Sequence, residues 1–324
     1  MKTKSYNFGY DVSSLSNYTD PNEDLLLVRS FFGAKSASLM TKQTGIKSAD
    51  QLNVMATDAI FQTGGVCDWS PSGTTTFTAR TLTIGKILVA ETICPSDLEA
   101  KWTQLKLTPG SQYESMPFEQ YYSEFKADII AEQIETAIWQ GDTNHGNANL
   151  SKFDGLIKLI DAASGVTQAN ASAYLGQTAI TTAVGFTTAN MPLILDAMTL
   201  ALPKTVLGKS DVAVFCGMDL AQKALVGYKN LNLFHYNITP GVEGIEFIIP
   251  GSNTKLIAVN GLNSTNRLFA ARTSNLYLGC DLQNEEDQFS IWYSTDFDQV
   301  RFRVKFKMGT QVAFPNEIVK FTLV

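Results

Sequence analysis

Residues 117–140, PFEQYYSEFKADIIAEQIETAIWQ, form the stretch that decides the fold. Pro117 and Glu119 suit the first turn of a helix, and Gly141 follows at a position where helices often end in a left-handed residue. At 1.5 Å per residue this helix would be about 36 Å long, which suits a backbone for the elements around it. Five apolar residues recur at helical spacing and are expected to face a core: Tyr122, Phe125, Ile129, Ile134 and Ile138.

The chain before this helix changes character twice. Residues 1–20 are polar and lack periodicity, which predicts an extended arm, and Asp20-Pro21 predicts the start of a helix whose pattern runs to Lys42. Residues 54–93 then combine turn residues with threonine-rich, β-branched runs that favour strands. The apolar content of residues 64–83 is too low to form a core. We therefore expect a long hairpin that projects and lies on another surface.

After the long helix, short apolar segments predict a mixture of helices and strands. A helix is expected over 192–202, capped by Asn190, and another near 220–228. A few helices among mainly antiparallel strands indicate an α+β fold. The strands are expected at 212–216, 245–249, 255–259 and 267–271.

Residues 300–308 carry the sharpest strand pattern, because apolar and basic residues alternate along them. The basic residues are Arg301, Arg303, Lys305 and Lys307, and they should share one face of the strand. Three explanations of this basic strip stay open. It is a protected or solvated sheet face, a partner for acidic groups of a neighbouring strand or subunit, or a contact with a phosphate backbone.

Composition restricts the classes of function. The 324 residues carry a net charge of −6, from 25 Lys+Arg and 31 Asp+Glu, which argues against a protein that grips nucleic acid over its whole surface. Charged residues make up only 17%, which is consistent with a surface that meets other protein. There is no apolar leader at the N-terminus and no run of about 18 apolar residues, so we expect no membrane association.

Catalytic and metal-binding motifs are missing from the sequence. We find no phosphate-binding loop, no dinucleotide fingerprint, no nucleophile elbow and no HExxH. The two histidines and four scattered cysteines do not form a zinc pattern. Asp142-Thr143-Asn144 begins like a calcium loop, but Gly146 and Phe153 stand where oxygen ligands are needed. We therefore expect no enzyme activity, no cofactor and no metal.

In the order of its elements the chain resembles tailed-bacteriophage major capsid proteins of the Hong Kong 97-type fold. In the general character of its sequence it is most similar to the capsid proteins of crAss-like phages. Three runs carry the resemblance. LVAETICPSDLE at 88–99 resembles the exit from the family's hairpin. IWQGD at 138–142 with FDGL at 153–156 resembles the end of its spine helix, and KMGTQVAFPNEIV at 307–319 resembles its final strands.

The resemblance implies a division of the chain into the family's parts. These are an N-terminal arm at 1–53, an E-loop at 54–93, a P-domain at 94–189 with a spine helix at 117–140, an A-domain at 190–285, and C-terminal P-domain strands at 286–324. It also implies that the hairpin contacts other subunits through residues such as Phe77, Arg80, Leu82 and Lys86.

The function implied is that of a structural shell protein. Copies would assemble into pentamers and hexamers of an icosahedral phage head, enclosing double-stranded DNA without sequence-specific binding. Assembly would take place in the host cytoplasm, with a portal and auxiliary or scaffold proteins as partners. Two alternatives stay open: an encapsulin-like compartment, which shares the fold and encloses a protein cargo, and a β-rich phage tail module, which would form a trimer or ring.

Overall fold

The computed structural model describes residues 34–61, 72–94, 118–231, 245–281, 288–297 and 299–324, so the expected arm at 1–20 and helix start at Asp20-Pro21 lie outside it. The chain divides into two compact units, which are described separately. Unit 1 takes its described residues mainly from Lys86–Ile134 and Asp281–Lys307. Unit 2 takes them from Lys35–Gly85, Glu135–Cys280 and Met308–Val324.

Unit 1 is a helix on a sheet. Its helix is α4 (Phe118–Gln140), which confirms the long helix expected here, and its strands are β4 (Gly85–Ile93), β11 (Gln288–Ser294) and β12 (Gln299–Val312). β12 pairs with β4 and runs antiparallel to β11. The rings of Tyr122 and Phe302 are nearly perpendicular, with their centroids 5.6 Å apart, so α4 covers the apolar face of β12. Both α4 and β12 continue into unit 2, at Glu135 and Met308.

The centre of unit 2 is a six-stranded mixed sheet in the order β5-β13-β9-β6-β8-β7. Neighbouring strands are antiparallel except β5 with β13 and β6 with β8, which are parallel. The four strands expected in this region are all present, the first with its predicted bounds. The six strands are β5 (Thr167–Gln168), β6 (Val212–Cys216), β7 (Glu246–Ile248), β8 (Lys255–Ala258), β9 (Arg267–Arg272) and β13 (Val319–Thr322).

Both faces of this sheet are covered, which explains why every residue of β6 is buried. On one face, α7 (Met191–Ala201) and α8 (Met218–Asn230) bury a cluster that includes Ile194, Met198, Val214 and Leu256. On the other face, Trp139 lies against the rings of Phe215 and Phe269, with centroid distances of 5.4 and 5.9 Å. These three rings form an aromatic cluster on that side of the sheet.

Both helices expected after residue 190 are confirmed, and Asn190 is the N-cap residue of α7 as predicted, but its side chain does not cap the helix. Asn190 has a helical backbone conformation and makes no side-chain capping bond to α7. Its amide oxygen instead accepts a hydrogen bond from the Thr187 N–H at 2.8 Å, and its Nδ2 donates to the Gly185 carbonyl at 2.8 Å. The asparagine therefore fixes the preceding turn rather than the helix end.

The helix expected to run to Lys42 ends earlier. α2 covers only Lys35–Leu39, and Thr41–Gln43 form β1, which runs parallel to β10 (Leu276–Cys280). Pairing with a strand more than two hundred residues away outweighs the local helical pattern. Nearby residues in the sequence give no sign of this pairing. β10 itself pairs with the end of β12, where Cys280 lies opposite Met308.

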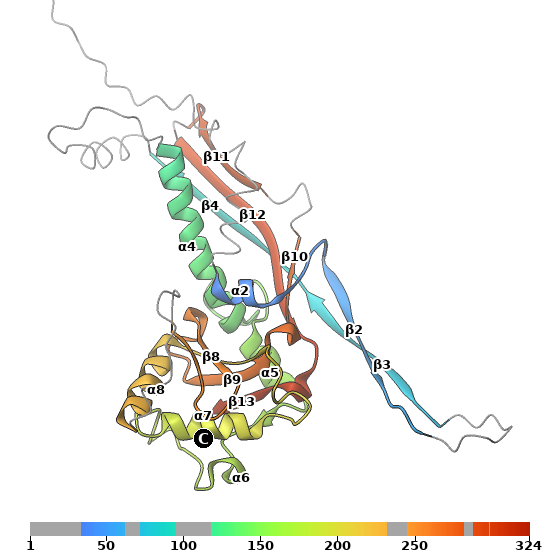
Figure 1. Ribbon diagram of the computed structural model, residues 1–324. Helices are drawn as coiled ribbons and strands as arrows, with labels where there is room; N and C mark the ends of the chain where they lie inside the picture. Colours follow the sequence, from blue (N-terminus) through green and yellow to red (C-terminus); the bar gives the residue numbers. More distant parts are fainter. Residues whose placement is uncertain (1–33, 62–71, 95–117, 232–244, 282–287, 298) are drawn as a thin grey trace, which may run out of the picture. The chain divides into compact units, whose positions relative to one another are not determined.

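The expected hairpin is present, with different bounds. β2 (Ala49–Thr57) and β3 (Thr75–Thr83) pair antiparallel along their whole length and with no other described strand (Figure 1). The first strand thus begins before residue 54. Residues 85–93, expected within the hairpin, form β4 and pair with β12 instead. The shorter elements are α5 (Leu156–Ala162), α6 (Ser172–Leu175), and the 3₁₀ turns Asn260–Leu262, Thr273–Asn275 and Pro315–Glu317. None of the helices described here is both long and apolar enough to cross a membrane.

Candidate assembly surfaces

The β2–β3 hairpin exposes large apolar side chains. Met55 and Phe77 lie directly opposite each other in the strand register, and they are 59% and 74% exposed. Phe61, just beyond β2, is fully exposed. An isolated two-stranded ribbon is marginal in water, and clustered apolar side chains on a surface mark a site of interaction. The ribbon therefore carries an exposed apolar pair, Met55 and Phe77.

The predicted hairpin residues do not share one surface. Phe77 is exposed and Arg80 is half-buried opposite Leu52, whereas the Leu82 side chain is completely buried. Lys86 lies on β4 in unit 1, outside the hairpin. Phe77 is thus exposed on the ribbon, while Leu82 is buried at the base of the hairpin.

The base of the hairpin packs against two glycines, Gly279 and Gly309, and is hydrogen-bonded to Gln311. Leu82 fills the space beside Gly279, where an added Cβ would lie 2.8 Å from the leucine Cδ2. A Cβ on Gly309 would lie 2.1 Å from the Thr83 carbonyl oxygen. The Gln311 Nε2 donates a hydrogen bond to the Thr81 carbonyl at 2.6 Å. These contacts hold the last residues of β3 at a fixed place in unit 2.

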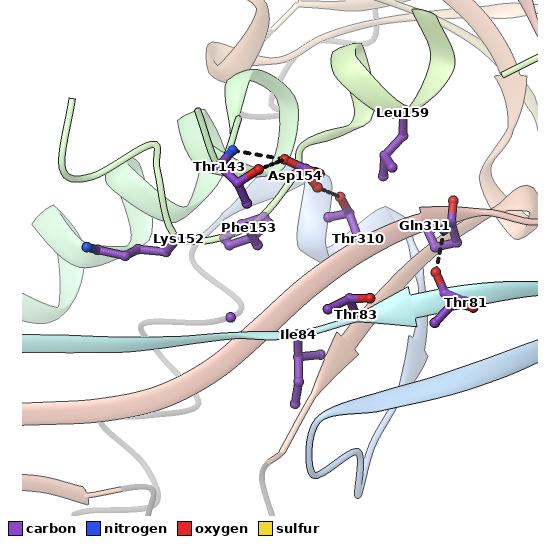
Figure 2. A pocket seen from close by; sticks show the side chains of 11 residues that line it. Thr81, Thr83, Ile84, Thr143, Lys152, Phe153, Asp154, Leu159, Thr310 and Gln311 are labelled. Atoms are coloured by element: carbon purple, nitrogen blue, oxygen red, sulfur yellow. Dashed lines mark hydrogen bonds between the residues drawn. The ribbon is translucent and has the colours of Figure 1, made fainter. Parts of the chain in front are cut away.

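A small pocket of about 130 Å³ lies beside this base (Figure 2). Thr83, Thr310 and Gln311 line it from the strands, and Thr143 and Asp154 line it from the loops after α4. Figure 2 shows the Asp154 carboxylate accepting from Thr143 while its backbone carbonyl accepts from the Thr310 hydroxyl at 2.8 Å. Sites for drug-sized ligands are typically about 300–1,000 Å³. This pocket is therefore a packing gap between elements rather than a substrate site.

In the loop that begins like a calcium site, the charge of a lysine balances the charges of the two aspartates. The Lys158 Nζ lies 2.7 Å from an Asp142 oxygen and 2.6 Å from an Asp154 oxygen, in the position where a cation would bridge them. Hydrogen bonds from Lys158 and from the Asn144 N–H lower the pKa of Asp142. Partial burial acts to raise the pKa of Asp154, but the bonds from Lys158 and Thr143 outweigh it and lower the pKa. The loop thus forms a salt-bridged turn.

The apolar residues predicted on the long helix lie on different faces. Ile134 and Ile138 are buried, but Phe125 is 54% and Ile129 is 38% exposed, so the prediction that they face the core is wrong. Phe125 and Ile134 are nine residues apart, which is two and a half helical turns and places them on opposite sides. Tyr122 is half-buried against Phe302. The exposed Phe125 and Ile129 add a second apolar surface to the chain.

The basic strip is present over most of its predicted length. Arg301, Arg303 and Lys305 are half-buried and alternate with buried apolar residues. Lys307 departs from this pattern, because it is 6% exposed and its Nζ lies 3.1 Å from the buried Asp281 carboxylate. A buried ion pair of this kind cannot also contact a partner, so the strip that a partner could reach consists of the other three residues.

A buried polar triad was not predicted from the sequence. The Glu135 carboxylate accepts hydrogen bonds from the Ser36 N–H at 2.8 Å and from the Ser36 hydroxyl at 2.6 Å, and the Trp139 Nε1 donates to the same hydroxyl at 2.6 Å. Burial raises the pKa of Glu135, while these bonds, a bond from the Gly261 N–H and the Lys35 charge oppose the rise. The triad fixes α2 to α4 within unit 2.

Nothing in the described residues suggests catalysis. No three or more His, Cys, Asp or Glu side chains of this part of the chain are grouped so that they could hold a metal ion. Burial, together with the charge of Asp219, raises the pKa of the Cys216 thiol far above its ordinary value. A buried thiol with a raised pKa is a poor nucleophile. The other candidate features of the described residues are surfaces: the exposed hairpin, the exposed Phe125 and Ile129 of α4, and the basic strip.

No protein-family profile and no curated protein sequence matches this chain. Solved structures do match it. A chain of the satellite phage P4 procapsid has a TM-score of 0.58 at 10% identity, covering 92% of this chain and 98% of that one. A chain from the capsid of an empty GTA particle has a TM-score of 0.59 at 10% identity and covers 90% of both chains. A virus-like particle from Pyrococcus furiosus has a TM-score of 0.52 at 9% identity, covering 93% and 98%.

These similarities establish the fold. The chain has the mixed helix-and-sheet fold of Hong Kong 97-type phage capsid proteins, as predicted. The resemblance to crAss-like phages in particular stays a prediction.

Proposed function

We propose that this chain is a major capsid protein, a structural shell subunit that forms pentamers and hexamers of an icosahedral phage head around double-stranded DNA. One observation carries the proposal: the fold matches subunits of a procapsid and of a capsid over nine-tenths or more of each chain. The low charge fraction and the exposed apolar pair on the hairpin support it, because a shell subunit is mostly surrounded by copies of itself.

The proposed mechanism is geometric. The hairpin acts as the E-loop and lies across the long helix of a neighbouring subunit, with Met55 and Phe77 as its apolar contacts. The N-terminal arm ties down an adjacent subunit, and α7 and α8 belong to the A-domain assigned to residues 190–285. Many modest interfaces then add up through multivalency. This role requires no cofactor and no catalysis, places the protein in the virion capsid after assembly in the host cytoplasm, and assigns it a portal and auxiliary or scaffold proteins as partners.

An encapsulin-like compartment is the second candidate function. It is favoured by the similarity to the Pyrococcus furiosus virus-like particle, which covers 93% of this chain. The two functions share the subunit contacts proposed above and differ in what the shell encloses. Nucleic acid that co-purifies with the particles and resists nuclease supports the phage head, whereas a co-purifying protein cargo supports the compartment.

The proposal is tested by electron microscopy of the purified full-length chain, with light scattering for its mass. Closed shells, or rings of five and six subunits, are the expected result. A discrete trimer would contradict the proposal and favour the tail module. A monomer should convert to shells when scaffold and portal proteins are co-expressed, and a chain that stays monomeric under those conditions is not a capsid protein.

A further inference from the structure

The 3₁₀ turn Asn260–Leu262 of unit 2 begins with Asn260-Gly261, which is the only Asn-Gly pair in the sequence. Asparagine is thermolabile, and it is most labile before glycine, because no side chain hinders the approach of the glycine nitrogen to the asparagine Cγ. A Cβ at residue 261 would overlap the Glu135 carbonyl oxygen and the Trp139 ring. Packing of the turn against α4 therefore requires the residue that makes Asn260 labile.

The reaction of such a pair is intramolecular. The Gly261 nitrogen loses its proton and forms a bond to the Asn260 Cγ, while the bond from Cγ to Nδ2 breaks and ammonia leaves with that proton. The product is a five-membered succinimide. Water then opens this ring at one of its two carbonyl carbons and gives aspartate or isoaspartate. Asn260 is exposed, so water can reach it, and the reaction needs no oxidant and no cofactor.

The folded turn keeps the Gly261 nitrogen out of the reactive geometry. Ring closure requires this nitrogen to eclipse the Asn260 Cβ, which a 3₁₀ backbone with ψ of about −20 to −30° does not allow. The peptide group between the two residues is also bonded at both ends. Its N–H donates to the Glu135 carboxylate, and its carbonyl accepts from the Asn263 N–H at 3.1 Å. Rotation of this peptide group into the reactive geometry breaks both bonds.

Helix α4 holds Gly261 from two sides. Besides the bond from its N–H to Glu135, its carbonyl accepts a hydrogen bond from the Gln140 Nε2 at 2.7 Å. The Glu135 carboxylate is itself fixed, because it is almost completely buried and accepts from the Ser36 N–H and hydroxyl at 2.8 and 2.6 Å. An acceptor fixed in this way cannot follow the N–H when the peptide group rotates, so opening of the turn costs free energy.

We propose that Asn260 is a deamidation site that the fold keeps closed: the bonds from Glu135 and Gln140 to Gly261 suppress succinimide formation in the native chain, and chains in which this turn is open convert Asn260 to aspartate or isoaspartate. Isoaspartate adds one carbon to the main chain between two bonded groups, so the product does not restore the turn. Asn263 also accepts from the Met218 N–H at the start of α8, at 2.7 Å. The conversion therefore reaches the neighbouring helix and marks chains that stayed open.

The test follows residue 260 of the full-length chain by peptide mass spectrometry, during incubation at mildly alkaline pH with and without urea. In urea the turn is open, and Asn260 should convert faster than Asn147 and Asn263, which do not precede glycine. Without urea the conversion should be slower by about tenfold or more, because it requires local opening of the turn. Equal rates with and without urea would overturn the proposal. This readout is independent of the proposed shell function, since it requires no particles.

Two variants of α4 test its hold on the turn. Gln140→Ala and Glu135→Gln should each raise the rate without urea severalfold and leave the rate in urea unchanged, because the open chain reacts in the same way. Circular dichroism shows whether each variant is folded, and Gln140→Ala, at a half-buried position, keeps the test decisive if Glu135→Gln does not fold.

Leu82→Ala is the matched control. It lowers stability at the base of the hairpin, where Leu82 packs with Ile46 and Ile84, and it leaves the bonds of the turn in place. Its rate at Asn260 without urea should equal that of the wild type. Equal acceleration by Leu82→Ala and by the α4 variants would overturn the proposal, because the site would then open only with the whole unit. Unchanged rates in folded α4 variants would overturn it as well.

Discussion

Glu135 illustrates how one residue can join segments that are distant in the sequence. Its carboxylate and Ser36 are 99 residues apart, and both side chains are almost completely buried. The carboxylate accepts from two donors of one residue, and the hydroxyl of that residue accepts from Trp139. Loss of the carboxylate would leave the Ser36 N–H buried without its acceptor. Buried groups of this kind cost the full desolvation penalty when a partner is removed.

We expect Glu135→Ala to lower the free energy of unfolding by about 2–4 kcal/mol, because it removes the hydrogen bonds that the carboxylate accepts from Ser36 and Gly261 and opens a cavity. Chemical denaturation of the full-length chain, followed by tryptophan fluorescence, measures the change. Gln222→Ala on the exposed side of α8 is the control and should change the free energy by less than about 0.5 kcal/mol. Equal effects of the two substitutions would show that the triad does not stabilise the fold.

The Asp142, Asp154 and Lys158 cluster predicts a pH dependence with a definite sign. The pKa of both carboxyls is lowered in the folded chain, so the unfolded chain binds more protons at mildly acid pH. Their contribution to stability is present above the ordinary aspartate pKa of about 3.9 and is lost as the pH falls through the folded values. We expect Lys158→Gln to flatten the fall in Tm between pH 6 and pH 3. A parallel pair of Tm curves would contradict this assignment.

At the scale of elements, the hairpin combines a rigid base with an exposed ribbon. The base depends on two glycines that leave room for neighbouring backbone and side chains, Gly279 beside Leu82 and Gly309 beside Thr83. Both glycines lie on strands, where glycine otherwise weakens the structure. Close approach of another element is the physical reason for glycine at these two places.

We expect Gly309→Ala to destabilise the chain by about 1–3 kcal/mol, because the new methyl group would overlap the Thr83 carbonyl and force the strand to shift. Hydrogen exchange should also increase in β3. Gly146→Ala is the matched control, since a Cβ at Gly146 meets no atom within 4 Å. Unchanged exchange in β3 would mean that the base does not hold the hairpin.

The exposed pair on the ribbon is expected to act in assembly rather than in folding. Met55→Ser/Phe77→Ser should leave the Tm within about 2 °C, because these side chains are mostly exposed, and should abolish or strongly reduce closed particles in electron micrographs. The neighbouring polar pair supplies the control: Thr57→Ser/Thr75→Ser removes two methyl groups from the same ribbon and should permit assembly. Normal shells from the first variant would disprove the role of the apolar pair.

The comparison of sequence with structure separates local patterns from distant contacts. β6 and β12 were predictable because their patterns lie in consecutive residues: a continuous apolar run in β6 and an alternation of basic and apolar residues in β12. The long helix was predictable, but its buried face was not, because its two apolar groups, one near Phe125 and one near Ile134, lie on opposite sides. The β1–β10 pairing, the place of β4 beside β12 and the burial of Glu135 depend on residues far away in the chain. The threonine-rich runs of residues 54–83 were enough to predict a hairpin, which β2 and β3 form, while its projection onto another surface stays a prediction.

At the scale of the whole molecule, two compact units share continuous elements. The division falls within α4, between Ile134 and Glu135, and within β12, between Lys307 and Met308. Each unit has a buried polar contact of its own near the division, Lys307 with Asp281 in unit 1 and Glu135 with Ser36 in unit 2. Units with separate cores often unfold in separate steps.

We expect differential scanning calorimetry of the unassembled chain to show two transitions. Lys307→Met removes the ammonium group that faces the buried Asp281 carboxylate and should shift the transition of unit 1. Glu135→Ala should shift the transition of unit 2. A single transition that both substitutions move by the same amount would show that the two units unfold together.

One strand gives the molecule a mechanical property. β12 carries the row of cations near its start and, near its end, Gly309 and Gln311, which hold the base of the hairpin. The backbone between them is extended and paired to neighbouring strands, so it resists stretching and transmits tension along its length. If the chain forms the proposed shell, a force on the unit 1 part of β12 acts on the same covalent strand that holds the base of the hairpin in unit 2.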